Sequence, residues 1–171
     1  MNNKYTKICM WIFFGLMVAI NGFIVFQACL PEGSSESWSN PVAEVIGNIS
    51  GGSVNPDTVI TPGLTFGLLI RKIIGHFALF GIDGIITYLF FYFLNKEVKL
   101  PKPYLYLIFA LLVGIIIPVL TEVIQLFVPG RVGDFVDVFI DIGGFVLFGG
   151  VAFLVTYLIN RHHEKKQLNN I

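Results

Sequence analysis

The sequence has little charge and little cysteine, and both shortages narrow the possible functions. Only 13% of the residues are charged and the formal net charge is zero. Because no basic stripe with interleaved aromatic residues is present, the sequence argues against a nucleic-acid partner. The two cysteines, Cys9 and Cys29, stand at the ends of one predicted helix, about 30 Å apart at a rise of 1.5 Å per residue. They cannot form a disulfide with each other within one chain, and they say nothing about the redox compartment.

Long apolar runs dominate the chain instead. Hydrophobic residues make up 55% of the 171 residues, and four runs approach or exceed the roughly 20 residues that a membrane-spanning helix needs. The sequence therefore predicts an all-α, polytopic membrane helix bundle in a lipid bilayer, with residues 1–171 in a single domain. The four predicted transmembrane helices cover about residues 8–30, 68–94, 104–127 and 134–160.

The first run is predicted to remain as a membrane span. Its apolar core of about 20 residues exceeds the 7–15 residues that are usual for the hydrophobic region of a signal peptide. The next segment, about residues 31–67, is rich in Ser, Gly, Asn and Pro. It is predicted to be an external surface loop with one short interfacial helix at its apolar patch, residues 42–49. Its glutamates leave specific binding open, although exposed acidic loops are usually only solvated.

Polar residues in the second run mark one side of the predicted helix. They follow one another at +4, +7 and +4, within about 60° of each other on a helix: Lys72, His76, Asp83 and Thr87. A histidine that shares a stripe with a lysine and an aspartate at membrane depth indicates a functional site. Two interpretations of Asp83 stay open, a structural hydrogen bond between helices and a role in chemistry.

A second group of polar residues lies within and between the last two runs. Its members are Glu122, Gln125, Arg131, Asp134, Asp137 and Asp141. Asp137 and Asp141 follow Asp134 at +3 and +7, so the three aspartates fall on one narrow arc of a helix. Glu122 and Gln125 share one side of the third span. Ionisable groups at membrane depth are costly and mark functional sites by default, so the arc is predicted to face protein or water.

Lysine and arginine are unequally divided between the two ends of the predicted bundle. Three lie at the end that carries the polar groups, and eight lie at the other: Lys4, Lys7, Lys96, Lys99, Lys102, Arg161, Lys165 and Lys166. The positive-inside rule then puts both termini in the cytoplasm. The polar groups of the last three spans are predicted to converge near the outer interface, because each lies within about 10 Å of it by helix rise.

Two further patterns receive structural interpretations. Gly143, Gly144, Gly149 and Gly150 in the fourth span would let a neighbouring helix approach closely. The tail RHHEKK, residues 161–166, has paired histidines like a metal-binding tract. Adjacent residues on a charged tail are, however, typical of a solvated helix end.

Three ordered motifs resemble those of the VanZ-like family. They are RKIIGHF from Arg71, EVIQLFVPGR from Glu122 and DFVDVFIDIGG from Asp134, and they cover the last three spans. Two positions depart from the family pattern: Asp141 stands where asparagine is common, and Phe80 stands where a tyrosine often follows the histidine. The resemblance implies a multi-pass protein of the bacterial cytoplasmic membrane. In some members the family is associated with reduced sensitivity to the glycopeptide teicoplanin, and the resemblance implies no particular reaction.

The polar residues can be given chemical roles. Cations at the outer interface can hold a phosphate or carboxylate, and a histidine can move a proton near neutral pH when a carboxylate orients it. The alternative is that the same charges form ion pairs that hold three helices together. The predicted catalytic residues are His76, Glu122 and Asp137, and the predicted binding residues are Arg71, Lys72, Gln125, Arg131, Asp134 and Asp141.

Three classes of function stay open. The first is a membrane enzyme or binding protein for the head group of an outer-leaflet phospholipid or lipid-linked wall precursor, which lowers teicoplanin sensitivity. The second is a small proton-coupled transporter with Asp83 as its deeper relay site, and the third is a non-catalytic envelope accessory protein that engages a partner through residues 31–67. No cofactor and no metal are predicted, because no His/Cys set has zinc spacing. A divalent cation held through oxygen ligands stays open for the acidic cluster, although nearby basic residues can neutralise it instead: Glu122, Asp134, Asp137 and Asp141.

Overall fold

The computed structural model describes residues 3–49, 56–62, 64–99, 101–102, 104–131 and 133–168, and nearly all of them are helical. Helix α1 (Asn3–Ala28) is followed by α2 (Glu32–Ile49) and by an antiparallel hairpin of β1 (Val59–Thr61) and β2 (Leu64–Thr65). A continuous helical stretch then contains α3 (Phe66–Ile70), the π-helical segment η1 (Arg71–Ala78) and α4 (Leu79–Val98). Helices α5 (Leu105–Gln125) and α6 (Phe135–Leu168) follow.

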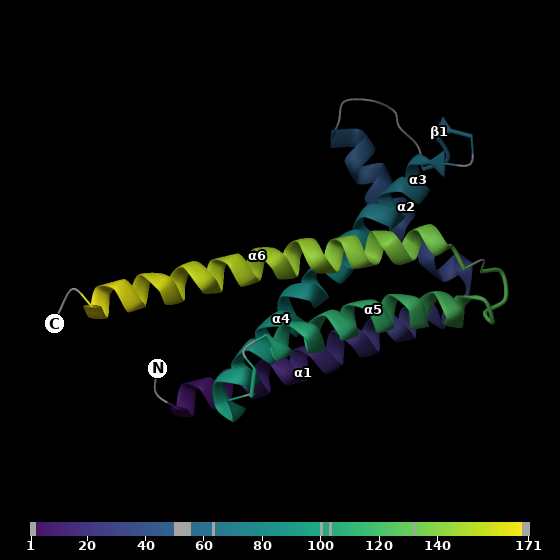
Figure 1. Ribbon diagram of the computed structural model, residues 1–171. Helices are drawn as coiled ribbons and strands as arrows, with labels where there is room; N and C mark the ends of the chain where they lie inside the picture. Colours follow the sequence, from purple (N-terminus) through teal and green to yellow (C-terminus); the bar gives the residue numbers. More distant parts are fainter. Residues whose placement is uncertain are drawn as a thin grey trace.

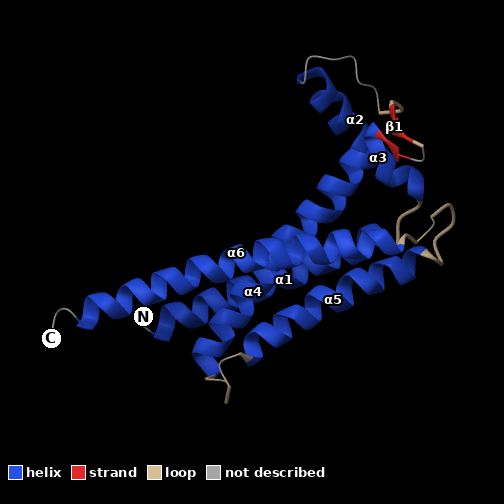
Figure 2. Ribbon diagram, turned by 45° about the horizontal axis from the view of Figure 1, so that its top comes forward, coloured by secondary structure: helices blue, strands red, loops and turns tan. Residues whose placement is uncertain are grey.

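The predicted bundle of four membrane helices is confirmed. Four helical stretches in the described part of the chain are long and apolar enough to cross a membrane: Lys4–Ala28, Phe66–Val98, Leu105–Gln125 and Phe135–Gln167. In Figure 1, α1, α4, α5 and α6 extend from the end of the bundle that holds both termini. The α5–α6 connection lies at the opposite end, and Figure 2 shows α2, α3 and the hairpin projecting beyond the long helices there.

The segment predicted to be a surface loop is largely helical: the helix expected at residues 42–49 is present within α2, but the loop prediction is wrong for residues 32–41. Helix α2 begins at Glu32, well before the short interfacial helix expected at residues 42–49, and it contains Pro41. A proline inside a helix removes one backbone hydrogen bond, and Ser and Gly are weak helix formers. Helix α2 nevertheless packs against α3 and η1 and buries Ala43, and such tertiary contacts override weak local propensity.

Glycines bring the continuous stretch of η1 and α4 into direct backbone contact with α6. An added Cβ at Gly84 would meet the carbonyl group of Phe145, and one at Gly144 would meet the carbonyl group of Phe77. A Cβ at Gly149 would lie 3.1 Å from the carbonyl oxygen of Gly84. The close approach predicted for Gly144 and Gly149 is therefore confirmed.

The same prediction is wrong for Gly143 and Gly150. A Cβ at either position would meet no described atom within 4 Å. Successive residues of an α-helix point about 100° apart, because 3.6 residues complete one turn. One glycine of each adjacent pair therefore faces the η1–α4 stretch, and the other faces away from it.

A buried aspartate connects α1 to α4. Asp83 is fully buried, and its Oδ1 accepts hydrogen bonds from Asn21 Nδ2 at 2.9 Å and from Thr87 Oγ1 at 3.0 Å. The structure thus contains the hydrogen bond between helices that was one of the two interpretations of Asp83. The apolar core of the bundle contains Ile24, Phe80 and Phe145.

Candidate functional site

The π-helical segment η1 carries the first residues of the candidate site. Turns of π-helix are rare and are frequently found at functional sites. Lys72 and His76 in η1 both contact α6, whereas Asp83 in α4 contacts α1. The predicted single polar stripe is therefore wrong, because the π-helical turns change the angular step between residues at the start of this helix.

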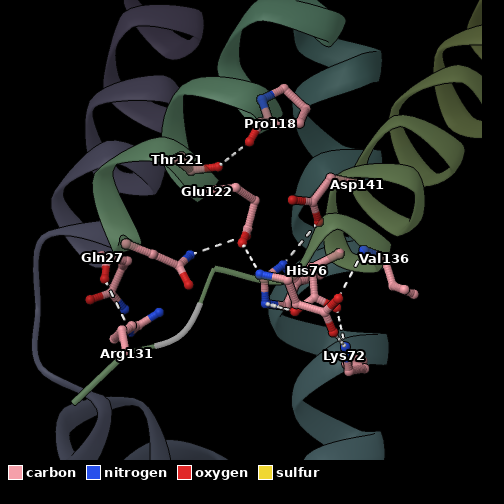
Figure 3. Close-up of polar contacts among 12 residues, drawn as sticks. Gln27, Lys72, His76, Pro118, Thr121, Glu122, Arg131, Val136 and Asp141 are labelled. Carbon is pink, nitrogen blue, oxygen red and sulfur yellow. Dashed lines mark hydrogen bonds and ion pairs between the residues drawn. The ribbon is translucent and has the colours of Figure 1, made fainter. Parts of the chain in front are cut away.

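His76 lies between two carboxylates of α6. Its Nδ1 is 3.0 Å from Oδ1 of Asp141, and its Nε2 is 3.8 Å from Oδ2 of Asp137 (Figure 3). The side chain of His76 is 16% exposed and that of Asp141 is 0% exposed. A shielded imidazole with a carboxylate at each nitrogen is held in one orientation, which suits proton transfer or metal binding.

Lys72 forms ion pairs at the beginning of α6. Its Nζ is 2.9 Å from Oδ2 of Asp134 and also contacts Asp137. The carboxylate of Asp134 accepts a second hydrogen bond, at 2.9 Å, from the backbone N–H of Val136. The hydrogen bond from the Lys72 ammonium lowers the pKa of Asp134 below its ordinary value. The positive charge that was predicted to hold a phosphate is therefore already shared between two carboxylates.

Glu122 and Gln125 complete the site from α5. Both side chains are buried. Oε2 of Glu122 accepts a hydrogen bond from the backbone N–H of Asp134 at 2.8 Å, and its Oε1 accepts one from Gln125 Nε2 at 3.2 Å. These bonds confirm that the two residues share one side of their helix, and they attach the end of α5 to the segment that precedes α6.

Arg131 attaches the α5–α6 connection to the end of α1. Its Nε donates to the carbonyl oxygen of Leu30 at 3.0 Å, and its Nη2 donates to that of Gln27 at 3.3 Å; Figure 3 shows Arg131 beside Gln27. The last carbonyl groups of a helix lack partners within the helix; Arg131 bonds to one of these, that of Gln27, and to the carbonyl of Leu30 just beyond the end of α1. Its positive charge also complements the negative end of the α1 dipole.

A cavity of about 320 Å³ opens beside His76. It lies between α1, α2, the η1–α4 stretch, α5 and α6. Its polar lining consists of Gln27, Arg71, His76, Thr121, Gln125, Arg131 and Asp141. Its apolar lining includes Phe23, Ile24, Ile70, Ile74, Leu79 and Phe80.

The structure brings the nine predicted site residues into one neighbourhood. Five of them line the cavity: Arg71, His76, Gln125, Arg131 and Asp141. The other four are bonded or paired to these residues or to one another: Lys72, Glu122, Asp134 and Asp137.

The contribution of α1 to the cavity was missed by the sequence reasoning. Phe23 and Ile24 line the cavity, yet in the sequence they do not differ from residues that face lipid. Gln27 is a polar residue near the end of an apolar run, and it is the one signal in that region that could have indicated a cavity.

The site lies within a stretch that matches one family model. The VanZ/LLP1 model matches residues 10–158, which reach into all four membrane-spanning helices. No curated protein and no solved structure matches the chain significantly. Because the matched stretch covers most of the 171 residues, the chain belongs to the VanZ/LLP1 family.

Proposed function

We propose that this protein binds the head group of an anionic lipid in the outer leaflet of the bacterial cytoplasmic membrane and acts on it. The lipid is a phospholipid or a lipid-linked cell-wall precursor. The observation that carries this proposal is the cavity, whose lining combines cationic and titratable groups with apolar side chains. A lipid requires both, because its head group is charged and its chains are apolar.

The apolar lining supports the part of the proposal that concerns the lipid chains. Phe23 is 43% exposed and Ile74 is 44% exposed, so the apolar surface continues from the cavity to the outside of the bundle, where the bilayer would lie. Ligand pockets typically measure about 300–1,000 Å³. The volume of about 320 Å³ therefore suits a head group, with its chains lying along the outer surface of the helices.

The polar lining supports the part that concerns the head group. Guanidinium groups form charge-assisted hydrogen bonds with phosphate and carboxylate oxygens, and Arg71 and Arg131 both line the cavity. His76 also lines it, with its ring fixed by Asp141 and Asp137. In this proposal the arginines hold the head group and His76 moves a proton to or from it.

The distribution of positive charge supports an outward-facing site. Eight of the eleven lysines and arginines are predicted to lie on the side of the two termini, which the positive-inside rule assigns to the cytoplasm. The cavity would then open to the outer leaflet. A change in an envelope lipid made there would lower sensitivity to teicoplanin, which is the effect that the family resemblance implies.

Filling the cavity tests this proposal. Gly75 lines the cavity, and an added Cβ there would meet only the side chain of Arg71, at 3.8 Å, among the described residues. The variant Gly75→Phe should therefore fold normally while its ring occupies cavity space. The matched control is Gly150→Phe, because a Cβ at Gly150 meets no described atom within 4 Å.

The measurement is native mass spectrometry of the full-length chain in detergent, titrated with phosphatidylglycerol. The wild-type and Gly150→Phe chains should bind this lipid, and Gly75→Phe should bind it roughly tenfold more weakly, a loss of about 1.4 kcal/mol. Equal binding by all three chains would contradict the proposal. Equal binding of phosphatidylcholine by the wild-type chain would contradict the selection of an anionic head group.

A further inference from the structure

Three side chains from three different helices converge beside the cavity. They are His76 from η1, Glu122 from α5 and Asp141 from α6, and one potential ligand atom of each lies within 4.8 Å of the other two. The two carboxylate residues are buried and the histidine is partly buried. His76 Nδ1 and Asp141 Oδ1 are already 3.0 Å apart. Two ligands of a tetrahedral Zn²⁺ ion, each about 2.1 Å from the metal, have a separation of about 3.4 Å.

Asp141 carries a second, independent sign of a missing ligand. The residue is 0% exposed, and its Oδ2 has no hydrogen-bond partner among the described residues. A buried carboxylate oxygen without a partner is costly, so buried charges are normally paired or coordinate a metal. A cation between Asp141, His76 and Glu122 would satisfy this oxygen.

The surrounding groups are arranged as they are around many metal ligands. A metal-bound histidine usually directs its other ring nitrogen to a carboxylate or carbonyl group, which fixes the ring. When Nδ1 of His76 is the ligand, Nε2 faces the carboxylate of Asp137 at 3.8 Å. Glu122 is oriented in a similar way, because the backbone N–H of Asp134 and the amide of Gln125 each donate a hydrogen bond to it.

We propose that His76, Glu122 and Asp141 bind one divalent transition-metal ion of the Zn²⁺ or Mn²⁺ class. The ligand set has one imidazole nitrogen and carboxylate oxygens, a combination that suits these ions. Ca²⁺ and Mg²⁺ prefer oxygen ligands alone, so the imidazole selects against them. Two members of the acidic cluster in the sequence, Asp134 and Asp137, are paired with Lys72, so they do not belong to the proposed set of ligands.

The remaining coordination positions of the ion would face the cavity, because His76 and Asp141 both line it. A phosphate oxygen of a lipid head group would bind there, and the ion would polarise the phosphoryl group as a Lewis acid. This last step rests on the lipid binding in the proposed function, whereas binding of the metal by the three side chains does not. With the ion bound, His76 acts as a ligand and not as the group that moves a proton.

The test measures metal binding in the absence of an anionic lipid. The full-length chain, purified without a polyhistidine tag and stripped with a chelator, is placed in nanodiscs of phosphatidylcholine. It is then titrated with ZnCl₂, MnCl₂ or CaCl₂ in a calorimeter. One Zn²⁺ or Mn²⁺ ion should bind per chain, and Ca²⁺ should bind more weakly.

Near-isosteric variants test the ligands one at a time. Glu122→Gln, Asp141→Asn and His76→Asn should each weaken binding of Zn²⁺ at least about tenfold, since even residues that only orient metal ligands contribute 10–100-fold. Asp83→Asn is the matched control, because Asp83 is also a fully buried carboxylate whose Oδ2 has no described partner. Its Oδ1 bonds to Asn21 and Thr87, and among the described residues Asp83 belongs to no group of potential metal ligands. The affinity of this control variant should equal that of the wild type.

The paired histidines of the tail need a control of their own. The double variant His162→Ala/His163→Ala should keep the bound ion, and loss of all binding in it would overturn the proposal. Binding of Zn²⁺ unchanged in all three ligand variants would also overturn it, and Ca²⁺ binding as tight as that of Zn²⁺ would overturn the proposed class of metal. The visible absorption spectrum of Co²⁺ bound to the wild-type chain should show a low-coordinate site with nitrogen and oxygen ligands, a readout that does not depend on whether the variants fold.

The two proposals can fail separately. Metal binding that persists when phosphatidylglycerol does not bind would leave the metal site standing and contradict the proposed function. Lipid binding by a chain that binds no metal would contradict the metal site and leave the proposed function standing.

Discussion

The glycine contact between η1 and α6 predicts a large difference between two adjacent substitutions. A methyl group at Gly144 would overlap the backbone carbonyl of Phe77, whereas one at Gly143 would meet no described atom within 4 Å. A backbone carbonyl cannot rotate away as a side chain can, so Gly144→Ala forces the two helices apart. The contact also supports the candidate site, because η1 and α6 carry its opposing residues.

The magnitude follows from this geometry. Overpacking of a well-packed core costs about 1–3 kcal/mol, and we expect Gly144→Ala to reach the upper part of that range because the clash is with backbone. A loss of about 3 kcal/mol lowers the ratio of folded to unfolded protein by about a hundredfold. Gly143→Ala should leave the free energy of unfolding unchanged or raise it by up to about 1 kcal/mol, since alanine favours the helix over glycine.

Reversible unfolding in mixed micelles of increasing SDS content, followed by helical circular dichroism, measures both free energies. The larger substitutions Gly144→Leu and Gly149→Leu should go further and lower the yield of folded protein. If Gly144→Ala is as stable as the wild type, or Gly143→Ala loses as much stability, the helix contact has been assigned to the wrong glycines.

Three other predictions concern topology, pH dependence and one hydrogen-bonded connection. In a chain without its native cysteines, Val59→Cys should react with a membrane-impermeant maleimide in intact cells and Lys166→Cys should react only after permeabilisation; the reverse pattern would invert the proposed orientation. Lys72 lowers the pKa of Asp134 in the folded protein. The ionised carboxylate therefore stabilises the fold fully above its unfolded pKa of about 4. This stabilisation is lost as the pH falls through the lower pKa of the folded state. The stability gap between the wild type and Asp134→Asn should therefore be full at about pH 6 and shrink by about pH 3, and a gap that grows with acid would refute the ion pair. Arg131→Lys replaces a two-point contact with α1 by one ammonium group and should lower the free energy of unfolding by roughly 1–3 kcal/mol; full stability in that variant would show that the contact contributes little.

The membrane spans and the polar site residues could be predicted because each stands out locally in the sequence. An apolar run of about 20 residues has few alternatives to a membrane helix. A charged residue within such a run is costly unless the fold gives it a partner. His76, Glu122 and Asp141 were identified in this way, although they come from three different spans.

Other features depend on contacts that no local pattern encodes. Helix α2 has a loop-like composition, and its contacts with α3 and η1 are not visible in its own residues. The π-helical turns of η1 differ from α-helix in which backbone groups are hydrogen-bonded to each other. The periodicity of apolar residues in the sequence does not predict this difference. For the same reason the sequence could not show that Lys72 pairs with Asp134 and Asp137 while Arg131 binds the end of α1.

Asp83 illustrates how the structure narrows an interpretation that the sequence left open. Its Oδ1 accepts from both Asn21 and Thr87, and Asp83 is not among the residues that line the cavity. The transporter hypothesis requires Asp83 to exchange protons with the candidate site around His76. A carboxylate held by two donors from its own and a neighbouring helix favours a structural role.

Photocrosslinking of a lipid to the wild-type chain tests the central claim most directly. Phosphatidylglycerol that carries a diazirine near its head group is incorporated into nanodiscs with the protein, illuminated, and the modified residues are mapped by peptide mass spectrometry. The lipid site predicts crosslinks concentrated at Phe23, Ile74 and Leu79, and their loss when unlabelled phosphatidylglycerol is added. Crosslinks spread evenly over exposed residues of α6 such as Val151 and Leu154, with no enrichment at the cavity, would contradict it.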